Sequence, residues 1–276
     1  MSKQQQPPVY PDEPQIPILP NMLTAGNLLC GFFAILTIFK GMEEGKGVAE
    51  AFSYYQTATY LIFAACAFDL LDGRVARMCK ADGPFGREFD SIADVVSFGL
   101  APSLLLVGGV LFRLENENIG WGIAVLYMLC AALRLARFNC MAAAPKKPNQ
   151  SMDFVGLPVP MAAGAVVSTF YLVSYFEEGK AIPEPLQYVM AVCMAVVSVL
   201  MMSRVIYPSF KHVNFEKKGT AMAILIAAMV IVLFILNAQV TPAVIFMCYL
   251  LYGLVVRPFL TRRVRHIIEV KEEGEE

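Results

Sequence analysis

Four aspartates in two closely spaced pairs have the clearest chemical potential in this chain. Asp69 and Asp72 are three residues apart, and Asp90 and Asp94 are four apart, in a sequence that is 57% hydrophobic. These spacings place the two members of each pair on one face of a helix. Like charges held together repel, and ionisable groups beside hydrocarbon are usually functional. Two such helices that converge would offer oxygen ligands suited to Mg²⁺ or Mn²⁺, whose natural substrate is a phosphate.

Small and basic residues lie between the two pairs. Gly73 and Ala76 would let a ligand or a neighbouring helix approach the backbone closely. Arg77 has a planar guanidinium that could neutralise phosphate charge. Residues 83–86 read Gly-Pro-Phe-Gly, which predicts a break or turn between the pairs. Any one aspartate could be a solvated loop charge paired with an arginine, but the combined pattern favours a site.

The composition indicates an all-α, polytopic membrane protein. Only 16% of the 276 residues are charged, against about 25% in soluble domains. Backbone groups in lipid must be satisfied internally, so apolar runs long enough to cross about 30 Å of hydrocarbon should be helices. About eight transmembrane helices are predicted, near residues 22–39, 54–71, 92–112, 119–140, 157–176, 186–203, 220–237 and 241–259. The last two are the least distinct, because their connection is short.

The remaining metal-binding residue types point to no second site. Seven cysteines show no CxxC spacing and lie in or beside apolar segments, which favours a packing role. His212 and His266 are too few and too scattered for a histidine-based site. The first residues lack the basic start and cleavage site of a signal peptide, so the first apolar segment is expected to be retained.

Lysine and arginine predict the orientation. They gather in one set of loops, at Lys3 and within residues 74–87, 134–147, 204–218 and 257–271, whereas the opposite side holds only Lys40, Lys46, Arg113 and Lys180. The positive-inside rule then places both termini and the aspartates in the cytoplasm, for a multi-pass protein of the cell (inner) membrane. The predicted organisation is a cytoplasmic segment 1–20, a catalytic membrane domain 21–215, a helix pair 216–260 and a charged cytoplasmic tail 261–276.

The aspartate segment resembles a known family signature. It reads D-x2-D-G-x2-A-R-x8-G-x3-D-x3-D and matches the CDP-alcohol phosphotransferases at every fixed position, which are Asp69, Asp72, Gly73, Ala76, Arg77, Gly86, Asp90 and Asp94. The resemblance implies the helical membrane fold of that family, commonly a homodimer. It also implies a polar cavity open to the cytoplasm, in which Mg²⁺ or Mn²⁺ meets the pyrophosphate of a CDP-linked lipid.

The same resemblance implies roles for single residues. Asp69, Asp72 and Asp90 match the metal-ligand positions, and Asp94 matches the position usually proposed as the base, with possible metal contact. The positions that line the nucleotide are matched by Gly73, Ala76, Arg77 and Gly86. Thr24 and Asn27 would face the nucleotide as in relatives, although Asn27 could equally join two helices.

Other segments bear on the acceptor alcohol. Residues 20–31, 133–139, 154–160 and 202–211 resemble the phosphatidylserine synthases of this family. The carboxylate of serine needs cationic donors, and the candidates are Arg134, Arg137 and Arg204, with Asn139 as a neutral hydrogen-bonder. Each arginine could instead be an interfacial anchor. Residues 156–160 read Gly-Leu-Pro-Val-Pro, which predicts a helix start.

The expected reaction is metal-dependent transfer of the phosphatidyl group from CDP-diacylglycerol to L-serine, giving phosphatidylserine and CMP. Another acceptor, such as glycerol phosphate, inositol phosphate or choline, is the alternative within this class. An ion-coupled transporter is the alternative from another class, but it predicts charges near mid-span, and here the aspartates lie at helix ends. The expected partners are the two substrates and the bilayer, and no nucleic acid.

Overall fold

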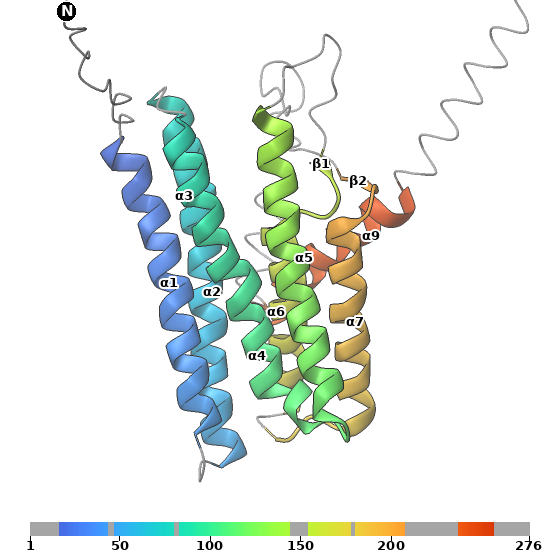
Figure 1. The fold of residues 1–276 in the computed structure, drawn as a ribbon. Helices are drawn as coiled ribbons and strands as arrows, with labels where there is room; N and C mark the ends of the chain where they lie inside the picture. The colour runs from blue at the N-terminus through green and yellow to red at the C-terminus, as the bar shows by residue number, and fades with distance from the viewer. Residues whose placement is uncertain are drawn as a thin grey trace, which may run out of the picture.

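Long apolar helices make up nearly all of the structure (Figure 1), a computed structural model that describes residues 17–43, 47–79, 83–143, 154–177, 180–207 and 237–256. The helices are α1 (Ile18–Met42), α2 (Val48–Met78), α3 (Pro84–Asp94), α4 (Ala101–Gly109), α5 (Glu117–Ala143), α6 (Val159–Phe176), α7 (Glu184–Met202) and α9 (Thr241–Leu251). Two-residue strands β1 (Phe154–Val155) and β2 (Ile206–Tyr207) pair antiparallel. The prediction of an all-α membrane bundle of this family's kind is confirmed, with this short β ladder as its one addition in the described part.

Five described helices are long and apolar enough to cross a membrane. They are α1, α5, α6, α7 and the continuous helical stretch Pro84–Arg113, which contains α3 and α4. The predicted spans 22–39, 92–112, 119–140, 157–176 and 186–203 correspond to these five. The predicted span 54–71 lies within α2, whose 31 residues extend for about 46 Å at 1.5 Å per residue.

The count of eight spans stays a prediction. The span 220–237 lies outside the described residues apart from its last one. The span 241–259 is described up to residue 256, as α9 and a π-helical turn over Tyr252–Val256. The segment before residue 17 and the tail 261–276 also lie outside the described residues.

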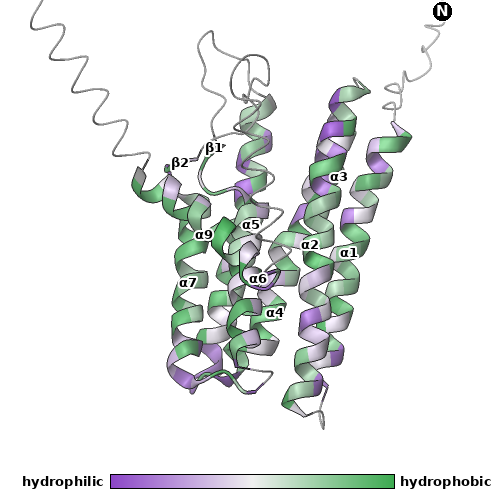
Figure 2. Ribbon diagram, turned by 180° about the vertical axis from the view of Figure 1, so that it is seen from behind, coloured by the Kyte–Doolittle hydropathy of each residue, from purple (hydrophilic) through white to green (hydrophobic). Residues whose placement is uncertain are grey.

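The outward surface of the bundle is apolar. Hydrophobic residues cover most of the length of α4 to α9 in Figure 2, and hydrophilic ones gather at the start of α3 and at the connection before α7. Large side chains such as Phe32, Leu129 and Val199 are about half exposed. A soluble protein would bury so many apolar side chains, so this surface faces lipid. The chain is an integral membrane protein.

The stretch from α3 to α4 joins the two halves of the bundle. Both α3 and α4 lie against α1, and α4 also contacts α2, α5 and α6 (Figure 1). Pro84 starts α3 directly after Gly83, as the Gly-Pro pair predicts, because proline is favoured in a first helical turn. Gly86, in contrast, lies inside α3 and not in the break. A π-helical turn over Val95–Leu100 separates α3 from α4.

Candidate active site

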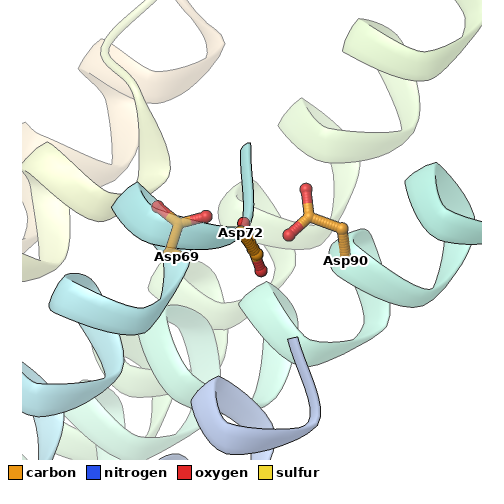
Figure 3. Close-up of side chains that lie close together, drawn as sticks. All are labelled: Asp69, Asp72 and Asp90. Atoms are coloured by element: carbon orange, nitrogen blue, oxygen red, sulfur yellow. The ribbon is translucent and has the colours of Figure 1, made fainter. Parts of the chain in front are cut away.

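Three carboxylates from two helices converge at one end of the bundle. Asp69 and Asp72 come from α2 and Asp90 from α3, and one ligand oxygen of each lies within 4.8 Å of the others. In the view of Figure 3, Asp72 lies between Asp69 and Asp90. The convergence predicted from the helical spacing is therefore confirmed for these three residues. This end of the bundle is called the aspartate end below.

The cluster fits a divalent cation. Asp90 Oδ1 is buried, and no donor among the described residues reaches it. None of the three carboxylates has an arginine or lysine partner in the described part of the chain, so their mutual repulsion is not offset by an ion pair there. Burying a carboxylate oxygen without a hydrogen-bond donor costs free energy unless a cation binds to it. Their oxygen chemistry suits a hard divalent ion.

Helix α1 supports the aspartates from the side, although it contributes no carboxylate. Thr24 Oγ donates to Asp72 Oδ2 over 2.8 Å, and Asn27 Nδ2 donates to Asp94 Oδ1 over 3.1 Å. Both donors are buried, and they lie three residues apart on one face of α1. One helix face thus fixes a carboxylate on α2 and another on α3.

Asp94 occupies a different place from the other three aspartates. It is the last residue of α3 and is only 5% exposed. It is not part of the three-residue cluster within 4.8 Å, and its described hydrogen-bond partner is Asn27. Asp72 of the cluster is buried to the same extent, so it is position and not burial that separates Asp94 from the three carboxylates that face each other.

A cavity of about 480 Å³ opens beside the cluster. Its lining includes six positions of the signature together with Thr24, namely Asp72, Gly73, Ala76, Arg77, Gly86 and Asp90. A Cβ added at Gly73 would meet no atom within 4 Å, so the backbone of α2 is open to a ligand there. Arg77 donates from Nε to the carbonyl of Gly73 over 2.8 Å, which orients its guanidinium along the same helix.

Sequence reasoning missed several lining residues, among them Asn21, Arg87 and Phe138. Asn21 could have been found, because it lies three residues before Thr24 on the same helical face. Its Nδ2 is buried without a described acceptor. Phe138 comes from α5, and no local signal connects it with α2 or α3.

Comparison with known proteins matches this geometry to a family. The family model described as CDP-alcohol phosphatidyltransferase matches residues 17–203. The chain belongs to this family. The enzyme is thus a CDP-alcohol phosphotransferase, and the family depends on a divalent metal, in agreement with the carboxylate cluster.

Three curated relatives are similar over most of the enzyme. A CDP-diacylglycerol–serine O-phosphatidyltransferase of Helicobacter pylori (strain ATCC 700392 / 26695) is 31% identical over 90% of this chain and 94% of its own length. One of the same name from Bacillus subtilis (strain 168) is 32% identical over 70% and 91%. An archaetidylserine synthase of Methanothermobacter thermautotrophicus is 36% identical over 69% of each chain.

The four predicted acceptor residues are more dispersed than the aspartates. Arg134 is 6% exposed, and its guanidinium carbon lies 5.6 Å from the ring centre of Phe138. Asn139 donates to Ser91 Oγ over 2.9 Å, and Arg204 is exposed just after α7. Among the described residues that line the cavity of the phosphotransferase, none is one of these four. Phe138 is the link between Arg134 and the cavity.

The guanidinium of Arg137 donates to three backbone carbonyl groups. Its Nη1 donates to the carbonyl of Met202, and its Nη2 donates to those of Val155 and Met201, over 3.0 to 3.2 Å. Gly156 is the residue after Val155 and has a φ of +84°. A Cβ at this position would lie 2.7 Å from Nη2 of Arg137, so only glycine leaves room for the guanidinium. The guanidinium therefore ties the entry to α6 to the end of α7. The predicted helix start is confirmed, because α6 begins at Val159 between two prolines.

Proposed function

We propose that this phosphotransferase moves the phosphatidyl group of CDP-diacylglycerol to the hydroxyl of L-serine, giving phosphatidylserine and CMP. The observation that carries the proposal is the cavity of about 480 Å³, because six signature positions line its wall and two of these six belong to the carboxylate cluster. Serine is supported by the names of the relatives from H. pylori, B. subtilis and M. thermautotrophicus.

Asp69, Asp72 and Asp90 would hold Mg²⁺ or Mn²⁺, with Asp94 as a possible further ligand. When bound, the cation neutralises the pyrophosphate and stabilises the charge that develops on the leaving CMP. The protein's own contribution is to hold these carboxylates close before substrate arrives, with Thr24 fixing one oxygen of Asp72. Such outer support usually matters for metal affinity.

The CDP head would lie in the cavity, while the lipid chains stay in the bilayer. Gly73, Ala76 and Gly86 leave room for the nucleotide, with Thr24 on the α1 side. Asn27, the other α1 residue predicted to face the nucleotide, is fully buried, donates to Asp94 and is not among the described lining residues. Arg77 would offer its remaining guanidinium donors to phosphate oxygens. The active site lies at the end of the helices because a donor with a polar head and apolar chains is held at a membrane rim.

In the chemical step the hydroxyl oxygen of serine attacks the lipid-side phosphorus. A new phosphorus–oxygen bond forms as the bond to the CMP oxygen breaks, and Asp94 takes the hydroxyl proton as general base. Asn27 occupies Oδ1 of Asp94, which leaves Oδ2 to receive the proton. The carboxylate of serine would be met by Arg134, Arg137 and Arg204, with Asn139 beside them. Arg137 would act mainly through the backbone that it holds.

The arrangement in the cell is part of the same proposal. The aspartate end and both termini would be cytoplasmic, in the cell (inner) membrane, since basic residues gather on that side. The catalytic unit would span 21–215, with segments 1–20, 216–260 and 261–276 as the start, an added helix pair and a tail. The enzyme would work as a homodimer, as the family resemblance implies.

The experiment that tests the proposal is CMP release by purified enzyme in lipid vesicles. Reactions contain CDP-diacylglycerol, Mg²⁺ or Mn²⁺, and labelled serine, glycerol phosphate, inositol phosphate or choline in separate tubes. The expected result is metal-dependent CMP release and a labelled lipid with serine alone. A labelled lipid with another alcohol instead would contradict the acceptor, and serine uptake into vesicles without CMP release would indicate a transporter.

The lipid donor has a second candidate. The archaetidylserine synthase relative favours a CDP-linked ether lipid as an alternative donor. Both donors should be offered at equal concentration with serine. A preference for the ether lipid would revise the donor and leave the reaction class unchanged.

A further inference from the structure

The π-helical turn that follows Asp94 is held from two sides by buried hydroxyl groups. Ser97 Oγ donates to the backbone carbonyl of Asn27 over 3.0 Å, and Tyr127 Oη donates to the carbonyl of Phe98 over 3.1 Å. Ser97, Phe98 and Tyr127 are all 0% exposed. The turn is thus hydrogen-bonded to α1 at Ser97 and to α5 at the next residue, Phe98.

The contact with α1 is unusually close. Asn27 binds this region twice, since its side chain donates to Asp94 while its carbonyl accepts from Ser97. Gly31 lies one helical turn after Asn27, and a Cβ there would lie 2.7 Å from Cα of Ser97 and would also overlap its Oγ. The missing side chain of Gly31 is therefore what lets the hydroxyl of Ser97 reach the Asn27 carbonyl.

The contact with α5 uses a carbonyl of the turn itself. In a π-helix each carbonyl pairs five residues ahead, so the regular ladder of the surrounding α-helix is interrupted there. Tyr127 supplies a donor to the Phe98 carbonyl at this interruption. Such turns occur often at functional sites, and here the turn starts at the residue after Asp94.

We propose that Ser97 and Tyr127 are positioning residues for Asp94, which clamp the π-helical turn between α1 and α5 and so set the depth and direction of its carboxylate. Neither residue touches substrate. They act through the backbone of α3 and through Asn27. The inference rests on the proposed role of Asp94 in accepting the hydroxyl proton, where a small displacement is costly to rate.

The test compares Ser97→Ala and Tyr127→Phe with two matched controls. Ser198→Ala also removes a fully buried hydroxyl, but that group bonds the carbonyl of Met194 within α7. Tyr171→Phe removes a buried phenol that pairs with Tyr60, away from the aspartates. The measurements are kcat, KM for CDP-diacylglycerol and Tm for each variant in the full-length enzyme.

The expected result is a fall in kcat of roughly 10- to 100-fold for both site variants, with KM for CDP-diacylglycerol unchanged and Tm equal to that of the matched control. The controls should keep the kcat of the unmodified enzyme. A purely packing role would lower Tm without lowering kcat per folded molecule. Unchanged kcat in both site variants, or an equal fall in the controls, would overturn the proposal.

Ser97→Cys is the second variant if Ser97→Ala fails to fold. It keeps a side chain of similar size but only a weak donor, so its kcat should lie between those of the unmodified enzyme and Ser97→Ala. A kcat equal to that of the unmodified enzyme would contradict the role of Ser97. If the enzyme proves to use another alcohol, the proposed acceptor fails, but kcat is measured with that alcohol and this test is unaffected.

Discussion

Thr24 donates its hydroxyl to Oδ2 of Asp72 over 2.8 Å, a contact between residues 48 positions apart in the chain. Thr24 also donates to the carbonyl of Pro20 at 3.2 Å, so its hydroxyl is shared between its own helix and α2. Because Asp72 belongs to the three-carboxylate cluster, α1 determines how one ligand oxygen is presented. On the proposed function, the first apolar helix would therefore support the metal site as well as cross the membrane.

Thr24→Val should weaken metal binding and leave the fold intact. Valine has nearly the same shape but no donor, so Asp72 loses one partner and gains rotational freedom. We expect the metal concentration for half-maximal CMP release to rise by about 10- to 100-fold, with recovery of activity at high metal. A titration of Mg²⁺ and Mn²⁺ against CMP release measures this change.

Thr37→Val is the matched control on the same helix. Thr37 bonds the carbonyl of Phe33 within α1 and lies 13 residues further along that helix than Thr24. Its metal dependence should equal that of the unmodified enzyme. An unchanged metal requirement in Thr24→Val would show that Asp72 needs no support from α1.

Compared with the unmodified enzyme, Asp90→Asn should have a higher Tm without metal and a lower Tm with metal. In EDTA the substitution removes one of three mutually repelling carboxylates, so Tm should rise above that of the unmodified enzyme. With Mg²⁺ or Mn²⁺ the unmodified enzyme gains stability by binding the ion, and the variant gains much less. Thermal unfolding in detergent, with and without metal, checks both directions.

Activity should fall in the same variant by more than roughly 100-fold, beyond the usual cost of losing an outer partner. Glu117→Gln is the control, since Glu117 is an exposed carboxylate at the start of α5. A Tm in EDTA that is unchanged or lower in Asp90→Asn would contradict the repulsion that the 4.8 Å cluster implies.

The aspartate cluster could be predicted because it follows from the spacing of residues that are close together in the sequence. Asp69 and Asp72 share a helix face by their spacing, and so do the carboxylates of the next helix. Because α3 begins at Pro84 only a few residues after α2 ends at Met78, the two pairs start close together in the chain, which favours their convergence. The apolar spans follow in the same way from runs of residues, which is why five predicted spans correspond to the candidate spans.

The sequence allowed Asn27 to join two helices, but which aspartate each α1 residue meets could not be predicted, because the partners come from distant helices. Asn27 meets Asp94 across 67 positions, and its amide suits a nucleotide equally well on chemistry alone. Arg137 likewise has a guanidinium suited to a substrate carboxylate, yet it bonds backbone carbonyls 64 and 65 positions away. The π-helical turn has no sequence signal of its own, since it depends on what packs around Ser97 and Phe98.

Arg137→Lys should lower both stability and acceptor affinity. Lysine cannot span the carbonyls of Val155, Met201 and Met202 with one planar group. The expected loss is about 1–3 kcal/mol of unfolding free energy, together with a higher KM for serine, because the entry to α6 loosens. Unfolding and serine titrations on one preparation measure the two effects.

Arg113→Lys is the control for that experiment, as Arg113 is exposed in the connection between α4 and α5. It should match the unmodified enzyme in both measurements. A normal Tm in Arg137→Lys would contradict the proposal that Arg137 stabilises the fold by joining α6 to α7. A normal KM for serine would contradict a role of Arg137 in the acceptor site.

Asp94→Asn should abolish most turnover while leaving CDP-lipid binding largely intact. The amide keeps the size of the side chain but cannot take the serine proton, and a general base typically contributes about 10²–10⁴-fold to a rate. Asp94 lies outside the three-carboxylate cluster and is not among the described residues lining the cavity, so the nucleotide should still bind. Single-turnover CMP release and binding of labelled CDP-diacylglycerol separate the two effects. Full activity in Asp94→Asn would exclude the base assignment, and loss of lipid binding would instead make Asp94 part of the metal or donor site.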